Sequence, residues 1–552
     1  MEIPEGSFDN NGAQTALDSV EMTPCGQLHS LAHQIFLESL RNFKLIKVCR
    51  LVCRSWNTTV SKVMQGRASV TIIEDSVNRL KAFKKLILKR EELNPLWPLP
   101  FKHINIIASN FADDCFNELI NDYLSDTTIT LTCSLVSKVR KNQFKAIYDF
   151  LVAHASRMVE LNIEKAVCEW TSDLAQINMP GLKRVSLEST SDESVLRFIQ
   201  SVILTSKSLE VIELVGDEPV IPIRMLAENK LETLRILNVS SDMPTADEWS
   251  ILGRASKLPP LKELRWHIWE CDINENFEKS AKHFAMLIQA VSESIEILNL
   301  NVIRVGLLPV LPKLREITLS CCECTMKEFC RSKFPSLERI TLLKWLSSWR
   351  DPEEDFDTHP GVTSITVSLM NYDFCCWAMD DVQNFADEYL PQFLRNLRGQ
   401  FPQIVELSIL DVPRYKSNFF RDVHQFFPEL KRLEVNGSTD FPSTYDEESD
   451  ESSEKEKEKS SNTEHFSSFL DFRALESISL GDKVELTNHV IRNCLAMIPK
   501  LKFMEFYWND CLSAQEVWDF LVDVNHIVIK SPPGSRKDYT LLKKLPNVYF
   551  AQ

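Results

Sequence analysis

The sequence lacks the short motifs on which most recognisable catalytic sites depend. Only 13 of its 552 residues are glycine, and it contains neither a GxGxxG pattern nor a Walker phosphate-binding loop. The GxSxG turn of serine hydrolases and the HExxH helix of zinc proteases are also absent. Because these patterns hold a phosphate, a nucleophile or a metal in a fixed backbone geometry, we expect a protein that is not an enzyme and that needs no cofactor.

The sequence also lacks an excess of positive charge and any long apolar run. Its formal net charge is −16, which disfavours non-specific attachment to nucleic acid or to an anionic membrane surface. No stretch approaches the roughly 18 apolar residues of a membrane span, and the first ten residues (MEIPEGSFDN) do not resemble a secretory signal. We therefore expect no nucleic-acid or membrane partner and a cytoplasmic or nuclear location, or both.

Cysteines are too scattered to form a disulfide framework. There are 15, an odd number, and they are spread along the chain, which is typical of reduced thiols inside the cell. The closest cluster is Cys321, Cys322, Cys324 and Cys330. Adjacent cysteines are poorly spaced for tetrahedral coordination, so we expect no metal site.

The sequence does contain a repeat of six residues with aliphatic side chains at the first, fourth and sixth positions. Examples are 182–187 (LKRVSL), 314–319 (LREITL) and 430–435 (LKRLEV). Most copies begin 19 to 27 residues apart, which is the period of leucine-rich repeats, with one strand and one helix each. We therefore predict an α/β solenoid, curved, with parallel strands inside and helices outside. The copies begin at Met158, Leu182, Leu209, Leu234, Leu261, Ile295, Leu314, Leu337, Val362, Ile404, Leu430, Leu475 and Leu501, with a degenerate fourteenth at Val524.

Residues 67–157 show a less regular version of the same alternation. Short strand patterns are separated by helical patterns at a spacing of about 26 to 33 residues. We interpret this region as irregular first repeats that join the N-terminal segment to a solenoid over 158–552. The expected strands are 69–73, 101–106 and 128–131, and the expected helices are 76–92, 111–124 and 138–156.

Two steps of the repeat are too long, those that begin at Val362 and at Leu430. The first contains residues 380–390, whose apolar spacing predicts an extended helix on the convex side. The second contains residues 446–459, which have no apolar side chain. Nothing in that tract can offset the entropy of ordering, so we expect a disordered acidic insertion near 440–465.

The acidic insertion has two readings. Ser443 and Ser453 each precede an acidic residue by three positions, which is the context favoured by casein-kinase-II-like enzymes. Phosphorylation would add charge to an acidic tract and make it regulatory. Acidic, serine-rich tracts are also common as solvated spacers, and the sequence leaves both readings open.

The segment before the repeats changes from polar to helical. Residues 1–27 are polar and aperiodic, and we expect them to be disordered. Residues 28–66 place apolar side chains at helical steps over more than one stripe, which predicts a small helical bundle with an apolar face left for a partner. The apolar side chains of this pattern are Leu28, Leu31, Phe36, Leu37, Leu40, Leu45, Val48, Leu51, Val52 and Trp56.

This segment resembles an F-box. The five residues from Val52 to Trp56 (VCRSW) match the Val-Cys-[Lys/Arg]-x-Trp close of that motif, although His29 stands where Pro is usual and Leu31 where Glu is usual. The resemblance implies a module that inserts its helices into the Skp adaptor of a cullin-RING (SCF) ubiquitin ligase, with the repeats as the receptor for a protein substrate. The residues implied to face the adaptor are Leu28, Phe36, Leu37, Leu40, Leu45, Val48, Leu51, Val52, Cys53 and Trp56.

A second reading keeps the repeats but not the ligase. In it, the chain is a leucine-rich-repeat scaffold, and the F-box-like segment only packs against its own solenoid. Both readings assign the binding role to the concave side of the strands, where the variable residues between the aliphatic ones point.

Most of the expected concave row is polar and of mixed sign, and its last strand differs. Phe503 and Tyr507, with Trp508 beside them, supply aromatic area suited to anchoring a protein partner. The alternative is that they pack under residues 538–552 as a cap. The candidate substrate-binding residues are Arg265, His267, Phe503, Glu505, Tyr507 and Trp508.

Overall fold

The computed structural model describes a large part of the chain beyond residue 67 and divides it into two compact units. Unit 1 runs to Trp170 and includes Ile177–Leu182, and unit 2 contains the rest from Lys183. The described residues are 68–73, 77–93, 99, 101–108, 114–134, 141–164, 177–188, 193–216, 226, 231–241, 251, 258–268, 275–301, 303–320, 324–343, 357–368, 390–415, 419–439, 471–481, 486, 488–508, 512–521, 524, 526–530 and 548–551.

Unit 1 is a parallel sheet of four strands in chain order, β1 to β4. Alternate residues of its strands, such as Ile104, Ile106 and Leu131, are buried because each strand packs one face into the core. The strands predicted from the sequence are present, with β2 shifted by two residues toward the C-terminus and β3 three residues longer than expected. The elements are β1 (Ser69–Ile73), α4 (Val77–Leu93), β2 (His103–Ala108), α5 (Asp114–Glu118), the π-helical turn η1 (Leu119–Tyr123), β3 (Thr128–Ser134), α6 (Lys141–His154), the 3-10 turn η2 (Ala155–Arg157) and β4 (Met158–Glu164).

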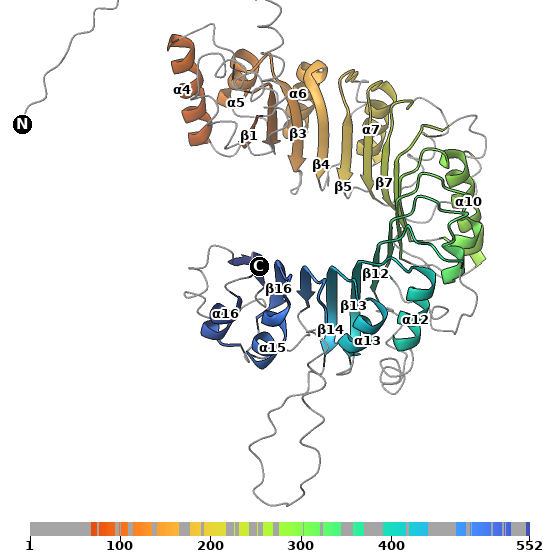
Figure 1. The fold of residues 1–552 in the computed structure, drawn as a ribbon. Coiled ribbons are helices and arrows are strands. Elements are labelled where there is room, and N and C mark those ends of the chain that lie inside the picture. Colours follow the sequence, from red (N-terminus) through yellow and green to blue (C-terminus); the bar gives the residue numbers. More distant parts are fainter. Residues whose placement is uncertain are drawn as a thin grey trace, which may run out of the picture. The chain divides into compact units, whose positions relative to one another are not determined.

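Unit 2 is a longer parallel sheet in which each strand from β5 to β18 pairs with its successor. In Figure 1 this sheet is curved, and α10, α12 and α13 lie along its outer side. The strands are β5 (Arg184–Glu188), β6 (Val211–Val215), β7 (Ile236–Ser241), β8 (Glu263–Ile268), β9 (Ile297–Leu300), β10 (Glu316–Leu319), β11 (Arg339–Leu342), β12 (Ser364–Ser368), β13 (Glu406–Tyr415), β14 (Arg432–Thr439), β15 (Ser477–Leu480), β16 (Phe503–Tyr507), β17 (His526–Lys530) and β18 (Val548–Ala551).

The helices of unit 2 vary with the length of each repeat. Between β9 and β10, and again between β10 and β11, the described residues form short 3-10 turns in place of the expected α-helix. The first of these steps is only 19 residues long, which leaves little chain for an α-helix. The α-helices are α7 (Glu193–Thr205), α10 (Glu275–Val291), α12 (Leu390–Gln400), α13 (Phe419–Phe426), α15 (Asn488–Asn493) and α16 (Ala514–Leu521). The 3-10 turns are η3 (Val305–Leu307), η4 (Met326–Glu328) and η8 (Leu495–Met497).

The aliphatic positions of the repeat form the core. The residue that opens each copy, from Met158 to Val524, is buried, and so are the two apolar residues that follow it in the strand, of which the second is aromatic in the copies at Leu261 and Leu501. Because one strand cannot bury this row by itself, stacking of successive copies is what stabilises the fold. The predicted α/β solenoid of parallel strands is confirmed.

One strand was not predicted. β18 extends the sheet from β17, within residues 538–552, which one of the two readings of the last strand makes a cap. The signal was in the sequence, since residues 545–550 (LPNVYF) follow the repeat pattern with phenylalanine in place of the last aliphatic residue.

Several predicted features lie outside the described residues. They are the polar lead at 1–27, the F-box-like segment at 28–66 and the acidic insertion near 440–465. Of the helix expected at 380–390, only Leu390 is described, where it begins α12. Among the described helices, none is long and apolar enough to cross a membrane.

Candidate binding surface

The exposed face of the unit 2 sheet is built from two rows of side chains, one at the first position of each strand and one two residues later. We call this face the inner face, and the strand register places each row side by side from β5 to β17. The first row is Arg184, Val211, Ile236, Glu263, Ile297, Glu316, Arg339, Ser364, Glu406, Arg432, Ser477, Phe503 and His526. The second row is Ser186, Glu213, Asn238, Arg265, Asn299, Thr318, Thr341, Thr366, Ser408, Glu434, Ser479, Glu505 and Val528.

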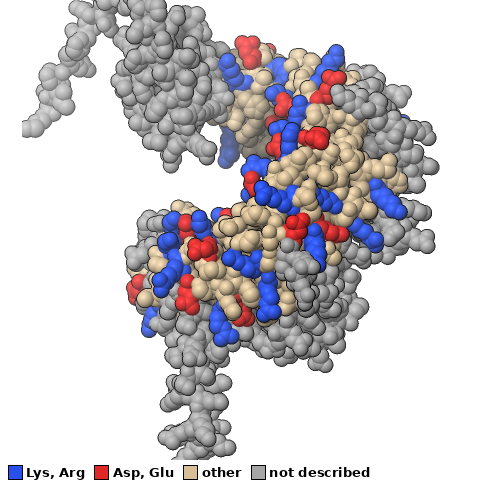
Figure 2. Space-filling model, turned by 45° about the vertical axis from the view of Figure 1, so that its right-hand side comes forward, with Lys and Arg blue, Asp and Glu red and all other residues tan. Residues whose placement is uncertain are grey.

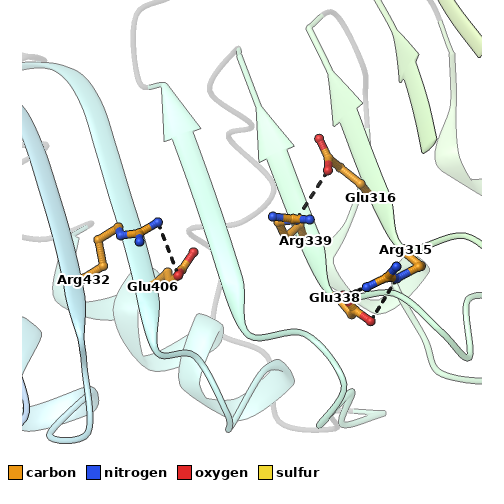
Figure 3. A network of polar contacts seen from close by, with 6 residues as sticks. All are labelled: Arg315, Glu316, Glu338, Arg339, Glu406 and Arg432. Carbon is orange, nitrogen blue, oxygen red and sulfur yellow. Dashed lines mark hydrogen bonds and ion pairs between the residues drawn. The ribbon is translucent and has the colours of Figure 1, made fainter. Parts of the chain in front are cut away.

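Ion pairs across neighbouring strands neutralise most of the charge in these rows. Arg339 Nε lies 3.4 Å from a carboxylate oxygen of Glu316, and an Arg432 guanidinium nitrogen lies 3.4 Å from Glu406, as Figure 3 shows. On the face visible in Figure 2, basic and acidic side chains lie next to one another and neither sign forms one large patch. Such a surface suits discrimination between partners through the arrangement of its positive and negative side chains and not through an excess of one charge.

A parallel set of ion pairs runs along the edge where the strands begin. The Arg315 guanidinium donates two hydrogen bonds to the Glu338 carboxylate, at 2.9 and 3.1 Å. These hydrogen bonds lower the pKa of Glu338 below its ordinary value. Similar pairs join Lys262 to Glu296 at 3.0 Å and Lys502 to Glu476 at 2.7 Å, so this edge is polar and self-paired.

The second row of β10 to β13 is neutral. It presents the hydroxyls of Thr318, Thr341, Thr366 and Ser408 on consecutive strands. Ser408 Oγ donates to the Glu434 carboxylate at 2.9 Å. This stretch offers weak, adaptable hydrogen bonding and little apolar area for a partner.

The inner face of β16 to β18 is aromatic. The rings of Phe503 and His526 stack with centroids 5.2 Å apart and planes 15° apart, and those of His526 and Tyr549 stack at 4.4 Å and 25°. The Lys530 ammonium pairs with Glu505 and lies over the Tyr507 ring, 5.4 Å from its centroid. The hydrogen bond to Glu505 raises the pKa of Lys530.

The predicted substrate-binding residues fall into two separate groups and one buried side chain. Arg265 and His267 are exposed on β8, where Arg265 pairs with Glu263 at 2.5 Å and loss of solvation lowers the pKa of His267. Three of the residues predicted on the last strand, at positions 503, 505 and 507, lie together on β16, eight strands further along the sheet. Trp508 is only 7% exposed and belongs to the core.

Sequence reasoning missed His526 and Tyr549, which complete the aromatic face. His526 occupies the same repeat position as Phe503 in the next copy, so the register of two adjacent strands would have placed the rings together. Tyr549 is 51% exposed on β18, the strand that was not predicted. Because β18 pairs with the edge of β17, it extends the inner face.

The predicted adaptor-binding residues, from Leu28 to Trp56, lie outside the described residues. Within the ranges that the structure describes, no three His, Cys, Asp or Glu side chains are grouped so that they could hold a metal ion.

Comparisons with known proteins give a weak structural likeness. No family model matches the sequence, and no curated protein matches it. Among solved structures, the chain is similar to one in the crystal structure of the Rad7 and Elc1 complex in yeast, with a TM-score of 0.32 and 11% identity. The match covers 69% of this chain and 81% of that chain. A TM-score of 0.32 carries no functional weight, so function is inferred from this chain's own residues.

Proposed function

We propose that the chain is a non-catalytic substrate-recognition subunit of an SCF-type ubiquitin ligase. Its F-box-like segment docks on a Skp-type adaptor and through it on a cullin-RING ligase, and the inner face of unit 2 binds the protein to be ubiquitinated. The observation that carries the proposal is the VCRSW close from Val52 to Trp56 followed by a long sheet face that presents two rows of polar and aromatic side chains. Such a face suits a protein surface better than a small substrate.

The substrate anchor is the aromatic part of the inner face. Phe503 and Tyr507 are half-buried on β16, and large aromatic side chains with part of their area exposed are favoured anchors for protein partners. The ion-paired side chains of the first row contribute shape and charge complementarity but little binding energy, because side chains that already have partners gain little from a new one.

The ligase acts in the cytoplasm, the nucleus or both. Cys115 and Cys330 are free thiols and are partly exposed. Free, partly exposed thiols suit the reducing interior of the cell. Fractionation of cells that express the tagged chain tests this location.

Co-purification with a Skp-type adaptor tests the proposal. Burial of large apolar side chains such as Leu51 and Trp56 contributes about 1.5–3 kcal/mol each, so Leu51→Asp and Trp56→Ala should abolish or sharply weaken adaptor binding. Thr341→Ala, on the inner face, is the matched control and should bind as the wild type does.

Two results would contradict the proposal. One is failure of the wild-type chain to bind the adaptor, which would favour a repeat scaffold that does not engage a ligase. The other is wild-type co-purification by Leu51→Asp, which would move the docking surface away from the F-box-like segment.

A further inference from the structure

The aromatic stack on the inner face has one ring face turned toward a strand with small side chains. Because Phe503 stacks on His526 of β17, the other face of its ring is directed toward β15. The register partner of Phe503 on β15 is Ser477, whose side chain is too short to cover a phenyl ring. The stack can therefore accept one more planar group above β15.

Two carboxylates flank that position. Glu434 on β14 and Glu505 on β16 lie on either side of Ser479 in the second row. With neighbouring strands about 4.8 Å apart, their backbones are separated by about 10 Å. A group placed above β15 would lie between the two carboxylates and beside the Phe503 ring.

The charge at this position is only partly neutralised. Among the described residues, Lys530 forms the ion pair with Glu505 and also interacts electrostatically with Glu434, which receives a hydrogen bond from the neutral Ser408. Arg432 precedes Glu434 by two residues but pairs with Glu406 on the opposite side, away from β15. Two carboxylates therefore share one internal cation, and the surface has capacity for a second.

Lys530 shows how this surface holds a cation. Its ammonium lies between a carboxylate, that of Glu505, and the face of an aromatic ring, that of Tyr507. The position above β15 repeats this combination with the carboxylate of Glu434 and the ring of Phe503. Its flat ring and its two carboxylates suit a planar cation better than a compact ammonium group.

We propose that the inner face above β15 binds an arginine side chain of the protein substrate, with its guanidinium stacked on Phe503 and donating hydrogen bonds to Glu434 and Glu505. The inference rests on the proposed substrate-receptor function and names the chemistry of its ligand. A guanidinium supplies a flat face for the ring and several N–H donors for the carboxylates. An acidic side chain would be repelled from the same position.

A peptide array tests this site on the full chain, with and without its adaptor. Each peptide, about nine residues long, is synthesised with arginine, lysine, citrulline or glutamate at its centre, and retention of the labelled full chain is measured. Citrulline keeps the shape of arginine without its charge. We expect arginine peptides to be retained about tenfold more strongly than their citrulline versions, since a charge-assisted hydrogen bond contributes about that factor, with lysine between them.

Variants move this preference in opposite directions. Glu434→Gln should lower retention of the arginine peptides about tenfold, and Phe503→Ser should lower it about threefold through loss of the ring face. Lys530→Met should raise it, because both carboxylates then lack their internal cation. Glu263→Gln, on the same face at β8, is the matched control and should change nothing.

Equal retention of arginine and citrulline peptides would overturn the inference, as would equal effects of Glu434→Gln and Glu263→Gln. Thermal unfolding of each variant confirms that it is folded, and the Lys530→Met arm detects the site by a gain that unfolding cannot produce. Adaptor co-purification is read from the same samples. Its loss in the wild type refutes the ligase function independently of the arginine result.

Discussion

Arg157 of unit 1 and the inner-face arginines of unit 2 have opposite roles. In unit 1, Arg157 is half-buried and directs its guanidinium at the backbone, donating to the carbonyls of Thr127 at 2.9 Å and Ile120 at 3.4 Å, and to that of Leu124. In unit 2, Arg339 and its equivalents on the inner face pair with carboxylates of neighbouring strands and stay largely exposed.

The reason for the difference lies in what each side chain satisfies. The π-helical turn η1 ends just before Leu124, and the last carbonyls of any helix lack intrahelical partners. Arg157 supplies the missing donors. The buried Thr127 hydroxyl accepts a hydrogen bond from Arg157 and donates one to the Leu124 carbonyl. The inner-face arginines serve groups that water could serve equally well. Arg157 therefore contributes to the fold of unit 1, whereas the inner-face arginines of unit 2 lie where a partner could contact them.

Replacing Arg157 should have the largest effect. Arg157→Met leaves several carbonyls without donors in a buried setting, and we expect the free energy of unfolding to fall by about 3 kcal/mol. Urea denaturation measures this change. Arg157→Lys keeps the charge but loses the planar fork and should recover only part of the loss; full recovery would show that charge alone matters.

The pH dependence of unit 1 should come next. Burial, and then the positive charge of Arg157, lower the pKa of His154 to about 4. An unfolded histidine has a pKa near 6.5, so between pH 6.5 and 4 the unfolded chain takes up a proton that the folded chain does not. The free energy of unfolding should therefore decrease as the pH is lowered from 6.5 to 4, by roughly 3 kcal/mol at most.

The variant His154→Gln isolates that contribution. It retains a polar side chain but cannot be protonated, so its unfolding free energy should vary less with pH between 6.5 and 4 than that of the wild type. The unfolding free energy of both proteins is measured by urea denaturation at each pH. If it varies equally with pH in the two proteins, the pH dependence comes from other groups.

On the inner face, the aromatic anchors should matter for binding and little for folding. Replacing Phe503 and Tyr507 together by Ser removes the anchor area, and we expect about 2 kcal/mol or more of lost substrate affinity, typical of a binding hot spot. Substrate half-life in cells should lengthen while the adaptor still co-purifies. The paired variant Thr318→Ala with Thr341→Ala, on the neutral row, should leave turnover unchanged; equal effects would place the anchor elsewhere.

The ion pairs of the inner face should have the smallest effect on stability. Arg339 and Glu316 are 54% and 33% exposed, and pairs of this kind contribute about 0–1 kcal/mol. Arg339→Met should therefore change the free energy of unfolding far less than Arg157→Met does. A loss as large as that of Arg157→Met would remove the contrast between the two units.

The sequence by itself determined where the strands lie. Aliphatic residues at the first, fourth and sixth positions, as in 314–319, can be buried together only if successive copies stack, so their spacing predicts both the strands and their order. Even the degenerate copy at Val524 forms β17. The same rule applied to residues 545–550, with phenylalanine admitted, would have found β18.

Only the tertiary structure decided which exposed side chains meet. Alternation along the strand is enough to place Trp508, which follows Tyr507 directly, in the core, but it does not say which residues meet across strands. The contact between Phe503 and His526, and the reach of Arg157 to the end of η1, join residues 23 to 37 positions apart. Local periodicity reports which face a residue occupies, whereas its neighbours on that face are set by the register between strands and by the loops that connect them.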